Sequence, residues 1–325
     1  MNSKNYEKPF KSYDELISKL RTDYNIIIDN EELALNLLST ISFYDLKNGY
    51  KEYLKKVSST QESISLETLL QFLIFDKNIQ MVLLKYSIYV ENFFKTKFAH
   101  FLGEHFGVDA SEYLNIDNYN KKEKGNLNKA LEKIKKNLNL KNADTPTKYY
   151  LEKHTHVPPW ILFKNIIFYD TTMLFKFLHP DDKRKIIQEY FDVNLIKSNN
   201  EEKDNEEDIE LFINMINIVR TFRNKIAHNY KVITYKSEYK LFLVNYKKID
   251  KYNLLTNWDI KYKKGINDLL AMILSISILL NNPILNFAFF QELYFAMIAD
   301  ENSLKSYEEI SGLPKNFYKR LEKLL

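Results

Sequence analysis

The sequence predicts an all-α protein, and three observations carry that prediction. Only six glycines and seven prolines occur in 325 residues, fewer than the turns of a β-rich protein need. Apolar residues recur at three- and four-residue intervals over several long stretches, which is the spacing of a buried helix face. Hydrophobic residues make up 45% of the chain, enough to form a real core.

Two capping signals define the first helices. The stretches 12–15 and 29–32 each place a capping side chain before acidic residues, and each opens a helix. Residues 24–28 between them are apolar and indicate a connector, with a short strand as the alternative. The longest helical pattern follows at residues 65–106, with an interruption expected near Asp76.

Three further helices are expected at residues 158–179, 209–228 and 266–281. With the helix through Glu91 they would form a bundle core. The predicted parts of the chain are a helical extension at 1–60, a core at 61–285 with insertions at about 115–150 and 232–264, and a helical segment at 286–325. The polar, acidic stretch 198–208 is expected to be a disordered loop.

The sequence lacks the features of exported, membrane and metal-binding proteins. The absence of cysteine excludes disulfides, Fe–S clusters and thiolate zinc sites, and it suits a reducing cytosol. There is no charged-then-apolar leader, and the apolar run 269–280 is too short to span a bilayer. We therefore expect a cytoplasmic protein with no membrane partner. His154 and His156 have no cysteine or carboxylate at ligand spacing, which favours a structural role, and no metal or other cofactor is expected.

One stretch at the end of the 209–228 helix departs from the composition of the rest. The chain has 42 lysines but five arginines, and two of these, Arg220 and Arg223, lie three residues apart here. An arginine in a lysine-rich chain indicates that its planar fork of donors is needed. Asn224 and His228 share a helix face, whereas Arg223 and His228 are about 140° apart on an ideal helix. Arg223 and His228 therefore converge only if the helix ends near His228 or a second copy completes the site.

Two basic stretches are candidates for RNA contact, with ordinary solvated helix surfaces as the alternative. Residues 121–141 hold eight lysines against two glutamates, and residues 235–264 interleave lysines with aromatic residues. Phosphates bind such cations, and unstacked bases stack on such rings. The candidate RNA-binding residues are Lys121, Lys122, Lys124, Lys133, Lys136, Tyr246, Lys247, Lys248, Tyr252 and Trp258.

The motif Arg223-Asn224-x-x-x-His228 at the end of a long helix resembles the R-N-x-x-x-H signature of HEPN-domain ribonucleases. More narrowly, the chain resembles the Abi family of phage abortive-infection proteins, the AbiD/AbiF-like group. The likeness lies in residues 8–17, 41–50, 75–79, 91–95, 158–163 and 311–317. Two positions depart from the family's pattern, since Phe317 stands where tryptophan is expected and Lys95 where arginine is common.

The resemblance implies a HEPN-like helical bundle and a metal-independent endoribonuclease of an anti-phage abortive-infection or toxin–antitoxin system. RNA supplies its own nucleophile, the 2′-OH, so DNA is not an expected substrate. His228 would act as a general acid or base, since imidazoles titrate near neutral pH. Arg223 would stabilise charge on the phosphate, and Asn224 would orient groups in the site.

The resemblance also implies supporting residues and partners. Glu91 and Lys95 become supporting partners of Arg223 or His228, together with Arg220, whereas spacing alone predicts an exposed Glu91–Lys95 ion pair. The active unit would be a homodimer, and a structured non-coding RNA or another antitoxin would inhibit it. Two alternatives stay open: a non-catalytic RNA-binding protein, and a HEPN subunit that acts with a nucleotidyltransferase.

Overall fold

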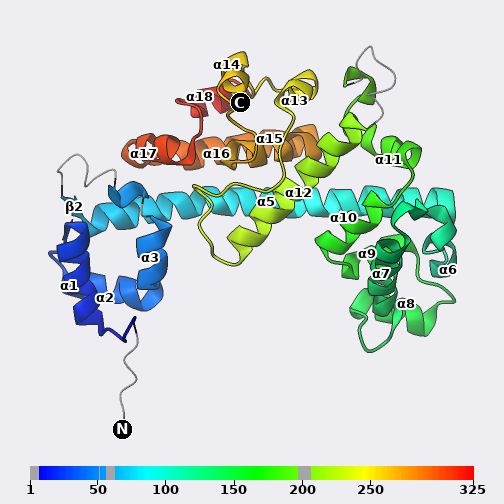
Figure 1. The fold of residues 1–325 in the computed structure, drawn as a ribbon, viewed down its shortest axis with the longest axis horizontal. Coiled ribbons are helices and arrows are strands. Elements are labelled where there is room, and N and C mark those ends of the chain that lie inside the picture. The colour runs from blue at the N-terminus through cyan, green and yellow to red at the C-terminus, as the bar shows by residue number, and fades with distance from the viewer. Residues whose placement is uncertain (1–6, 51, 56–62, 197–205) are drawn as a thin grey trace, which may run out of the picture.

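The computed structural model describes residues 7–50, 52–55, 63–196 and 206–325, and this part of the chain is almost entirely helical (Figure 1). The predicted all-α class is confirmed. Two short strands, β1 (Ile26–Ile27) and β2 (Ile64–Ser65), pair in parallel. The prediction of an irregular connector at residues 24–28 is therefore wrong for Ile26 and Ile27, which form β1. The partner strand β2 lies far away in the sequence, so no local pattern reveals the pairing.

Helix α5 (Leu66–Phe106) is the spine of the molecule. It has 41 residues, which corresponds to about 60 Å. Ser65 caps its start by accepting a hydrogen bond from the Thr68 N–H. Gly107, with φ of 102°, ends it in a conformation that glycine adopts without strain.

The interruption expected near Asp76 is wrong, because α5 continues through this residue. Asp76 is fully buried, and one carboxylate oxygen accepts from the Tyr50 hydroxyl at 2.9 Å and from the Gln80 amide at 2.7 Å. These side-chain donors satisfy that oxygen, so it does not compete for the backbone N–H groups of the helix.

Two groups of helices lie on the same side of α5, one at each end (Figure 1). The N-terminal lobe contains α1 (Tyr13–Tyr24), α2 (Glu31–Thr40) and α3 (Phe43–Gly49). The two predicted caps are confirmed, because Ser12 forms a capping box with Glu15 before α1 and Asn30 caps α2. The second lobe contains α6 (Ala110–Tyr113), α7 (Lys124–Lys135), α8 (Thr145–Lys153), α9 (Pro159–Asn165) and α10 (Phe168–Lys176).

The single helix expected at residues 158–179 is instead the pair α9 and α10. Ile166 and Ile167 separate them with extended backbones. Both are β-branched, a side-chain type that favours extended backbone, and Ile166 is buried. Burial of this side chain in the core therefore accompanies the break.

A layer of helices covers the other side of α5. Helix α12 (Glu207–Ala227) crosses α5 and packs against it and against α15 (Leu269–Leu279), whose residues are all buried as predicted. The remaining helices of this side are α11 (Pro180–Ile187), α13 (Leu243–Ile249), α14 (Asn257–Lys261), α16 (Pro283–Ile298), α17 (Glu301–Ser311) and α18 (Tyr318–Glu322). Buried apolar residues from α1 to α18 belong to one connected core. Helix α16 starts before the boundary expected at residue 285 and packs on α5.

Most of the acidic loop expected at 198–208 lies outside the described residues, but its end is helical. Glu207 and Asp208 begin α12, and Asp208 is buried against Arg184. In the described part of the chain, none of the helices combines the length and the apolar character needed to cross a bilayer.

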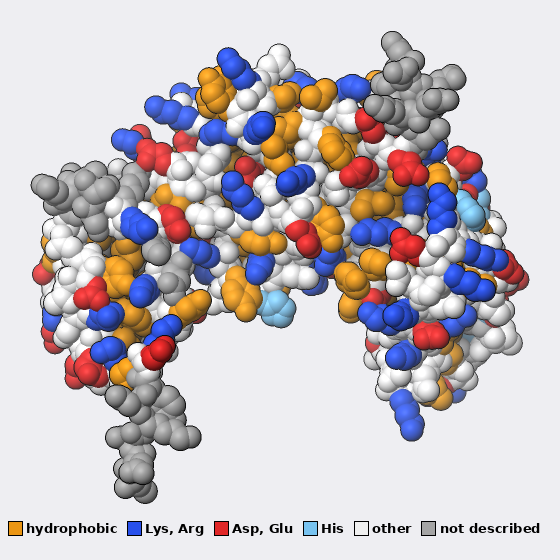
Figure 2. Space-filling model, in the orientation of Figure 1, with side chains coloured by type: hydrophobic (Ala, Val, Ile, Leu, Met, Phe, Trp, Pro, Cys, Tyr) orange, Lys and Arg blue, Asp and Glu red, His pale blue; other side chains and the backbone are white. Residues whose placement is uncertain are grey.

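The two lobes leave a hollow between them (Figure 2). Histidine and basic side chains are visible at the roof of this hollow. The C-terminal end of α12 descends toward the same place in Figure 1, so the fold exposes the end of this helix between the lobes.

Candidate functional site

Helix α12 ends at His228, where the sequence predicted an end, and it ends in a Schellman turn. Asn229 adopts a left-handed conformation with φ of 60°. Its N–H donates to the Ile226 carbonyl and the Tyr230 N–H donates to the Lys225 carbonyl, both at 2.9 Å. This is the hydrogen-bond pattern that closes a helix when the following residue tolerates a left-handed backbone, as asparagine does. His228 is therefore the C-cap, and its side chain is exposed.

A lysine on α5 fixes this turn in place. Lys77 donates from Nζ to the Asn229 Oδ1 at 2.7 Å and to the Gln80 Oε1 at 3.0 Å. The segment that follows His228 is thus hydrogen-bonded to the spine of the molecule. Sequence reasoning missed both Lys77 and Asn229, although an asparagine directly after an amphipathic helix is a known C-terminal signal.

The structure brings Glu91 and Lys95 to Arg223. The Glu91 carboxylate receives Lys95 Nζ on one oxygen at 2.8 Å and Arg223 Nη2 on the other at 3.2 Å. Glu91 and Lys95 are only 13% and 14% exposed, so the alternative of an exposed ion pair is wrong. Two cations share one carboxylate, which leaves the trio with a formal charge of +1 beside the helix end. Their role in catalysis stays a prediction.

Asn224 connects Arg223 with His228. Its Oδ1 accepts from Arg223 Nη1 at 3.1 Å, so its NH₂ group is available to donate. Asn224 and His228 both line a cavity of about 250 Å³, whose other walls are Thr221, Lys225, Tyr230 and Tyr235. Asn224 and His228, which were predicted to share a helix face, therefore line the same cavity.

Arg223 and His228 are not joined by a hydrogen bond or an ion pair in the described residues. Arg223 pairs with Glu91 of α5, whereas His228 lines the cavity that it shares with Asn224. Arg223 Nε is buried and has no hydrogen-bond partner among the described residues. One chain thus offers a single imidazole, a partly exposed guanidinium and an amide donor.

Arg220 belongs to a second cluster, one turn earlier on α12. It donates to the Asn217 Oδ1 at 3.2 and 3.0 Å, and its guanidinium lies 5.1 Å from the centre of the Tyr169 ring on α10. Lys133 of α7 lies 5.6 Å from the same ring. This cluster connects the basic helix α7 with the motif helix. No short-range pattern in the sequence marks Tyr169, because its neighbours in this cluster come from distant segments.

The candidate RNA-binding lysines of the first stretch are exposed before α7, on it and directly after it, in the second lobe. The candidate residues of the second stretch lie in and around α13 and α14, at the opposite edge of the molecule from the end of α12 (Figure 1). Tyr235, which begins this stretch, instead lines the cavity of Asn224 and His228. In this stretch Lys247 and Lys248 make contacts within the protein, to the Asp250 carboxylate and the Ile196 carbonyl. Trp258 is 52% exposed, but the Tyr262 ring lies 4.3 Å from its ring and Lys264 Nζ lies 5.4 Å from it, so neighbours in the protein already cover part of Trp258.

Tyr246 is a correction, and Tyr252 is a weaker candidate than the sequence indicated. Tyr246 is fully buried, and its hydroxyl bonds to the Leu274 carbonyl and to Ser277. A base cannot stack on a ring enclosed in the core, so Tyr246 is not an RNA contact in this fold. Tyr252 packs edge-on against Phe290 with centres 4.9 Å apart, and its face is only partly open.

Among the described residues, no group of three His, Cys, Asp or Glu side chains stands where it could hold a metal ion. His154 packs against the Tyr150 ring at 4.5 Å, and His156 hydrogen-bonds Thr155 at 3.3 Å. Both contacts agree with the structural role favoured for the two histidines.

Comparison with known proteins gives one match. Residues 36–234 match the family of Abi-like proteins. The match covers more than half of the chain and includes α5, α12, Glu91 and the Arg223–His228 motif. This chain belongs to the Abi-like protein family. No curated protein and no solved structure matches it.

Family membership suggests a role in abortive infection, a defence against phage. The matched region begins within α2 and ends just after α12, so it contains every residue that lines the cavity of Asn224 and His228 except Tyr235. Helices α13 to α18 lie beyond it and include the second basic stretch.

Proposed function

We propose that this Abi-like protein is a metal-independent endoribonuclease of an anti-phage abortive-infection or toxin–antitoxin system. The observation that carries the proposal is the grouping of Arg223, Asn224 and His228 at the exposed end of α12, with the Glu91–Lys95 pair behind Arg223. This matches the roles that the HEPN-type motif requires: a cation for a phosphate, a proton-transfer group, and an amide that orients.

The chemistry needs only the groups present and the RNA itself. The 2′-oxygen attacks the adjacent phosphorus and loses its proton, the bond to the 5′-oxygen breaks, and that oxygen gains a proton. The products are a 2′,3′-cyclic phosphate and a 5′-hydroxyl. His228 transfers one of these protons, and the remaining donors of Arg223 hold the phosphate oxygens as their charge grows. The net positive trio at Arg223 attracts the phosphate beforehand.

We propose that the active unit is a homodimer with a composite site. One chain offers one imidazole at the end of α12, whereas two proton transfers are served best by two positioned groups. A twofold axis beside this helix end would place His228 of each copy at one phosphate, since such an axis sets the same patch opposite itself. The hollow between the lobes leaves the end of α12 open to a second copy (Figure 2).

The composite site of the dimer can be tested by mixing wild-type and variant subunits. Wild type and His228→Ala chains are co-expressed with different tags, and the heterodimer is isolated. Near-complete loss of cleavage is expected, and retention of about half the activity per dimer would contradict the composite site.

We further propose that a structured RNA, or another antitoxin, holds the enzyme inactive. The exposed lysines of α7 and the Lys133–Tyr169–Arg220 cluster supply cations and a ring along one path to the motif. RNA should therefore co-purify with the protein from its native host. A preparation free of RNA from that source would remove this support.

The decisive experiment is cleavage of labelled RNA by wild type and by His228→Ala, with and without EDTA. Wild type should cut RNA but not DNA of the same sequence, EDTA should have no effect, and His228→Ala should bind RNA without cutting it. Binding without any cleavage by wild type would favour the non-catalytic alternative. A strict need for added Mg²⁺ would place the chemistry elsewhere.

A further inference from the structure

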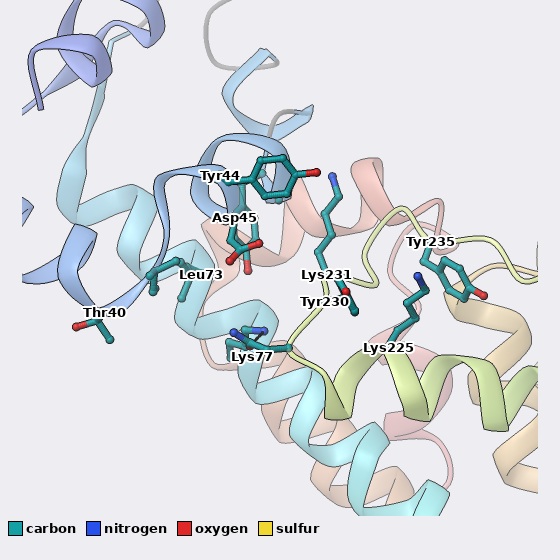
Figure 3. Close-up of a pocket in the computed structure, with 13 residues that line it drawn as sticks. Thr40, Tyr44, Asp45, Leu73, Lys77, Lys225, Tyr230, Lys231 and Tyr235 are labelled. Atoms are coloured by element: carbon teal, nitrogen blue, oxygen red, sulfur yellow. Dashed lines mark hydrogen bonds between the residues drawn. The ribbon is translucent and has the colours of Figure 1, made fainter. Parts of the chain in front are cut away.

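A second cavity lies directly beside the motif, between the N-terminal lobe and the end of α12. It has a volume of about 410 Å³, within the range of small-molecule sites. Helix α3, helix α5 and the segment after α12 form its walls. In Figure 3, Lys231 lies between Tyr44 on one wall and Lys225 with Tyr235 on the other.

Three lysines line this cavity: Lys77, Lys225 and Lys231. Lys231 pairs with Glu52 at 3.2 Å, whereas Lys77 and Lys225 form no ion pair within the described part of the chain. Burial lowers the pKa of Lys77. Since neither Lys77 nor Lys225 has a carboxylate partner among the described residues, a negatively charged ligand in the cavity has two cations with which to pair. Asp45 is a lining carboxylate on the α3 side.

The cavity also presents aromatic faces. Tyr44 is 71% exposed at its edge, and Tyr230 is 56% exposed on the segment after α12. Lys225 lies 4.9 Å from the centre of the Tyr230 ring and 5.4 Å from that of Tyr235. Rings next to cations match a ligand that has both a flat aromatic part and an anionic part. A nucleotide has both.

This cavity and the cavity of Asn224 and His228 are neighbours that share three residues: Lys225, Tyr230 and Tyr235. A ligand chain that occupies one space can therefore continue into the other without leaving the surface. The hydrogen bond from Lys77 to Asn229 ties the wall of the second cavity to the turn that ends at His228.

We propose that this cavity is a nucleotide subsite, which holds the RNA residue next to the cleaved phosphate. Its base stacks on Tyr44 at the edge, and Lys225 and Lys77 hold the phosphate that leads toward His228. The inference rests on the proposed function, since it takes the ligand in the neighbouring cavity to be the cleaved RNA. It assigns to the N-terminal lobe a direct part in choosing where the RNA is cut.

The test is equilibrium binding to the full chain in the His228→Ala background, where RNA stays intact. Fluorescein-labelled octamers of adenosine, cytidine and uridine are titrated and followed by anisotropy. Tyr44→Ala should weaken binding roughly tenfold and reduce the differences among the three octamers, because a stacking ring is lost. Lys77→Gln should weaken binding of all three by a similar factor, through the loss of a phosphate contact and of the hydrogen bond that fixes Asn229 in the cavity wall.

Matched controls lie on the same elements of the fold. Tyr13→Ala removes an exposed tyrosine of the N-terminal lobe, and Lys85→Gln removes an exposed lysine of α5 that pairs with Glu292. Both should bind like the parent. Thermal unfolding checks each variant, and Tyr44→Ala should remain folded because its ring is largely exposed.

The outcomes separate this inference from the proposed function. If Tyr44→Ala and Lys77→Gln bind all octamers like the parent, the subsite is refuted even when wild type cleaves RNA. If wild type cleaves nothing but the cavity variants lose binding, the nuclease is refuted and the nucleotide site stands. AMP is added as a competitor. If AMP binds tightly enough to displace the octamers, and Tyr44→Ala weakens the binding of AMP but not that of the octamers, the ligand is a free nucleotide. The assignment to RNA is then overturned.

Discussion

Each end of α12 takes part in a pair between an arginine and a carboxylate, yet the surroundings of the two pairs differ. At the start, Arg184 Nε meets Asp208 at 3.1 Å, with Arg184 18% and Asp208 5% exposed. At the end, Arg223 Nη2 meets Glu91 at 3.2 Å, with Arg223 33% and Glu91 13% exposed. The distances are alike, and the surroundings decide what each pair can do.

The sign of the local charge is the first difference. Arg184 also lies 3.6 Å from Asp181, so two carboxylates among the described residues share this cation near the start of the helix, where negative charge suits the helix dipole. At the end, Arg223 and Lys95 share the single carboxylate of Glu91, and the balance is positive. Only the second arrangement attracts a phosphate. The comparison indicates that one pair holds the fold together and the other is open to a ligand.

The largest effect is expected from substitution of His228 at the C-terminal end of α12. His228→Ala should reduce RNA cleavage by about 10²- to 10⁴-fold, the usual contribution of a general acid or base. Its side chain is exposed, so the free energy of unfolding should change by less than about 0.5 kcal/mol. Cleavage rates and urea unfolding measure the two quantities. His100→Ala, an exposed histidine of α5, is the control, and an equal loss in both variants would contradict the assignment.

Substitution of Arg184, in the pair at the start of α12, should have the opposite result, which is a change in stability and not in cleavage. Arg184→Ala leaves the Asp208 carboxylate buried without its cation, which should lower the free energy of unfolding by roughly 3 kcal/mol. Cleavage per folded molecule should stay unchanged, because the pair lies at the far end of the helix. Urea unfolding at pH 7 tests the first part, and a cleavage assay under stabilising conditions tests the second. A loss of catalysis without a loss of stability would invalidate the comparison.

The substitution Arg223→Lys tests whether the site at the C-terminal end of α12 needs only a positive charge or also the planar shape of the guanidinium. Lysine keeps the cation but lacks the planar fork by which Arg223 contacts Glu91 and Asn224 from two nitrogens and still faces a phosphate, so cleavage should fall by roughly 10- to 100-fold. Initial rates at saturating RNA report this change. Full activity of Arg223→Lys would mean that positive charge alone suffices. The same substitution at Arg184 should leave the rate unchanged.

The smallest effect, counted for each pH unit, is expected at Asp76, a buried carboxyl group held by neutral donors rather than by an arginine. Burial raises its pKa, against the opposing hydrogen bonds of Tyr50 and Gln80. The folded protein therefore keeps this proton at pH values where the unfolded chain has lost it. The stability that this proton contributes is fully present below about pH 4. It is lost as the pH rises toward the folded pKa, by about 1.4 kcal/mol for each pH unit.

Asp76→Asn should remove this pH dependence. Urea unfolding between pH 4 and 7 should show wild type losing stability relative to the variant as the pH rises. A relative gain of wild-type stability over the same range would show that the pKa of Asp76 is lowered instead.

Much of the fold was predictable because its signals are local. Ser12 and Asn30 bond to backbone groups within three residues, and the apolar stripes repeat every turn, so a short window of sequence contains them. The end of α12 at His228 belongs to this class, since Asn229 supplies the left-handed residue directly after the helix. The motif residues and the all-α class were therefore available from the sequence by itself.

Only the tertiary structure decided what surrounds them. The Glu91–Arg223 contact joins α5 to α12, the Lys77–Asn229 bond does the same, and the cavity beside His228 needs the N-terminal lobe as its wall. The tertiary structure also buries Tyr246 while it leaves Trp258 half-exposed in the same basic stretch. It places Ile166 in the core at the break between α9 and α10. Such features depend on which distant segments pack together, and the energy of that packing is a property of the whole core rather than of any short window of the chain.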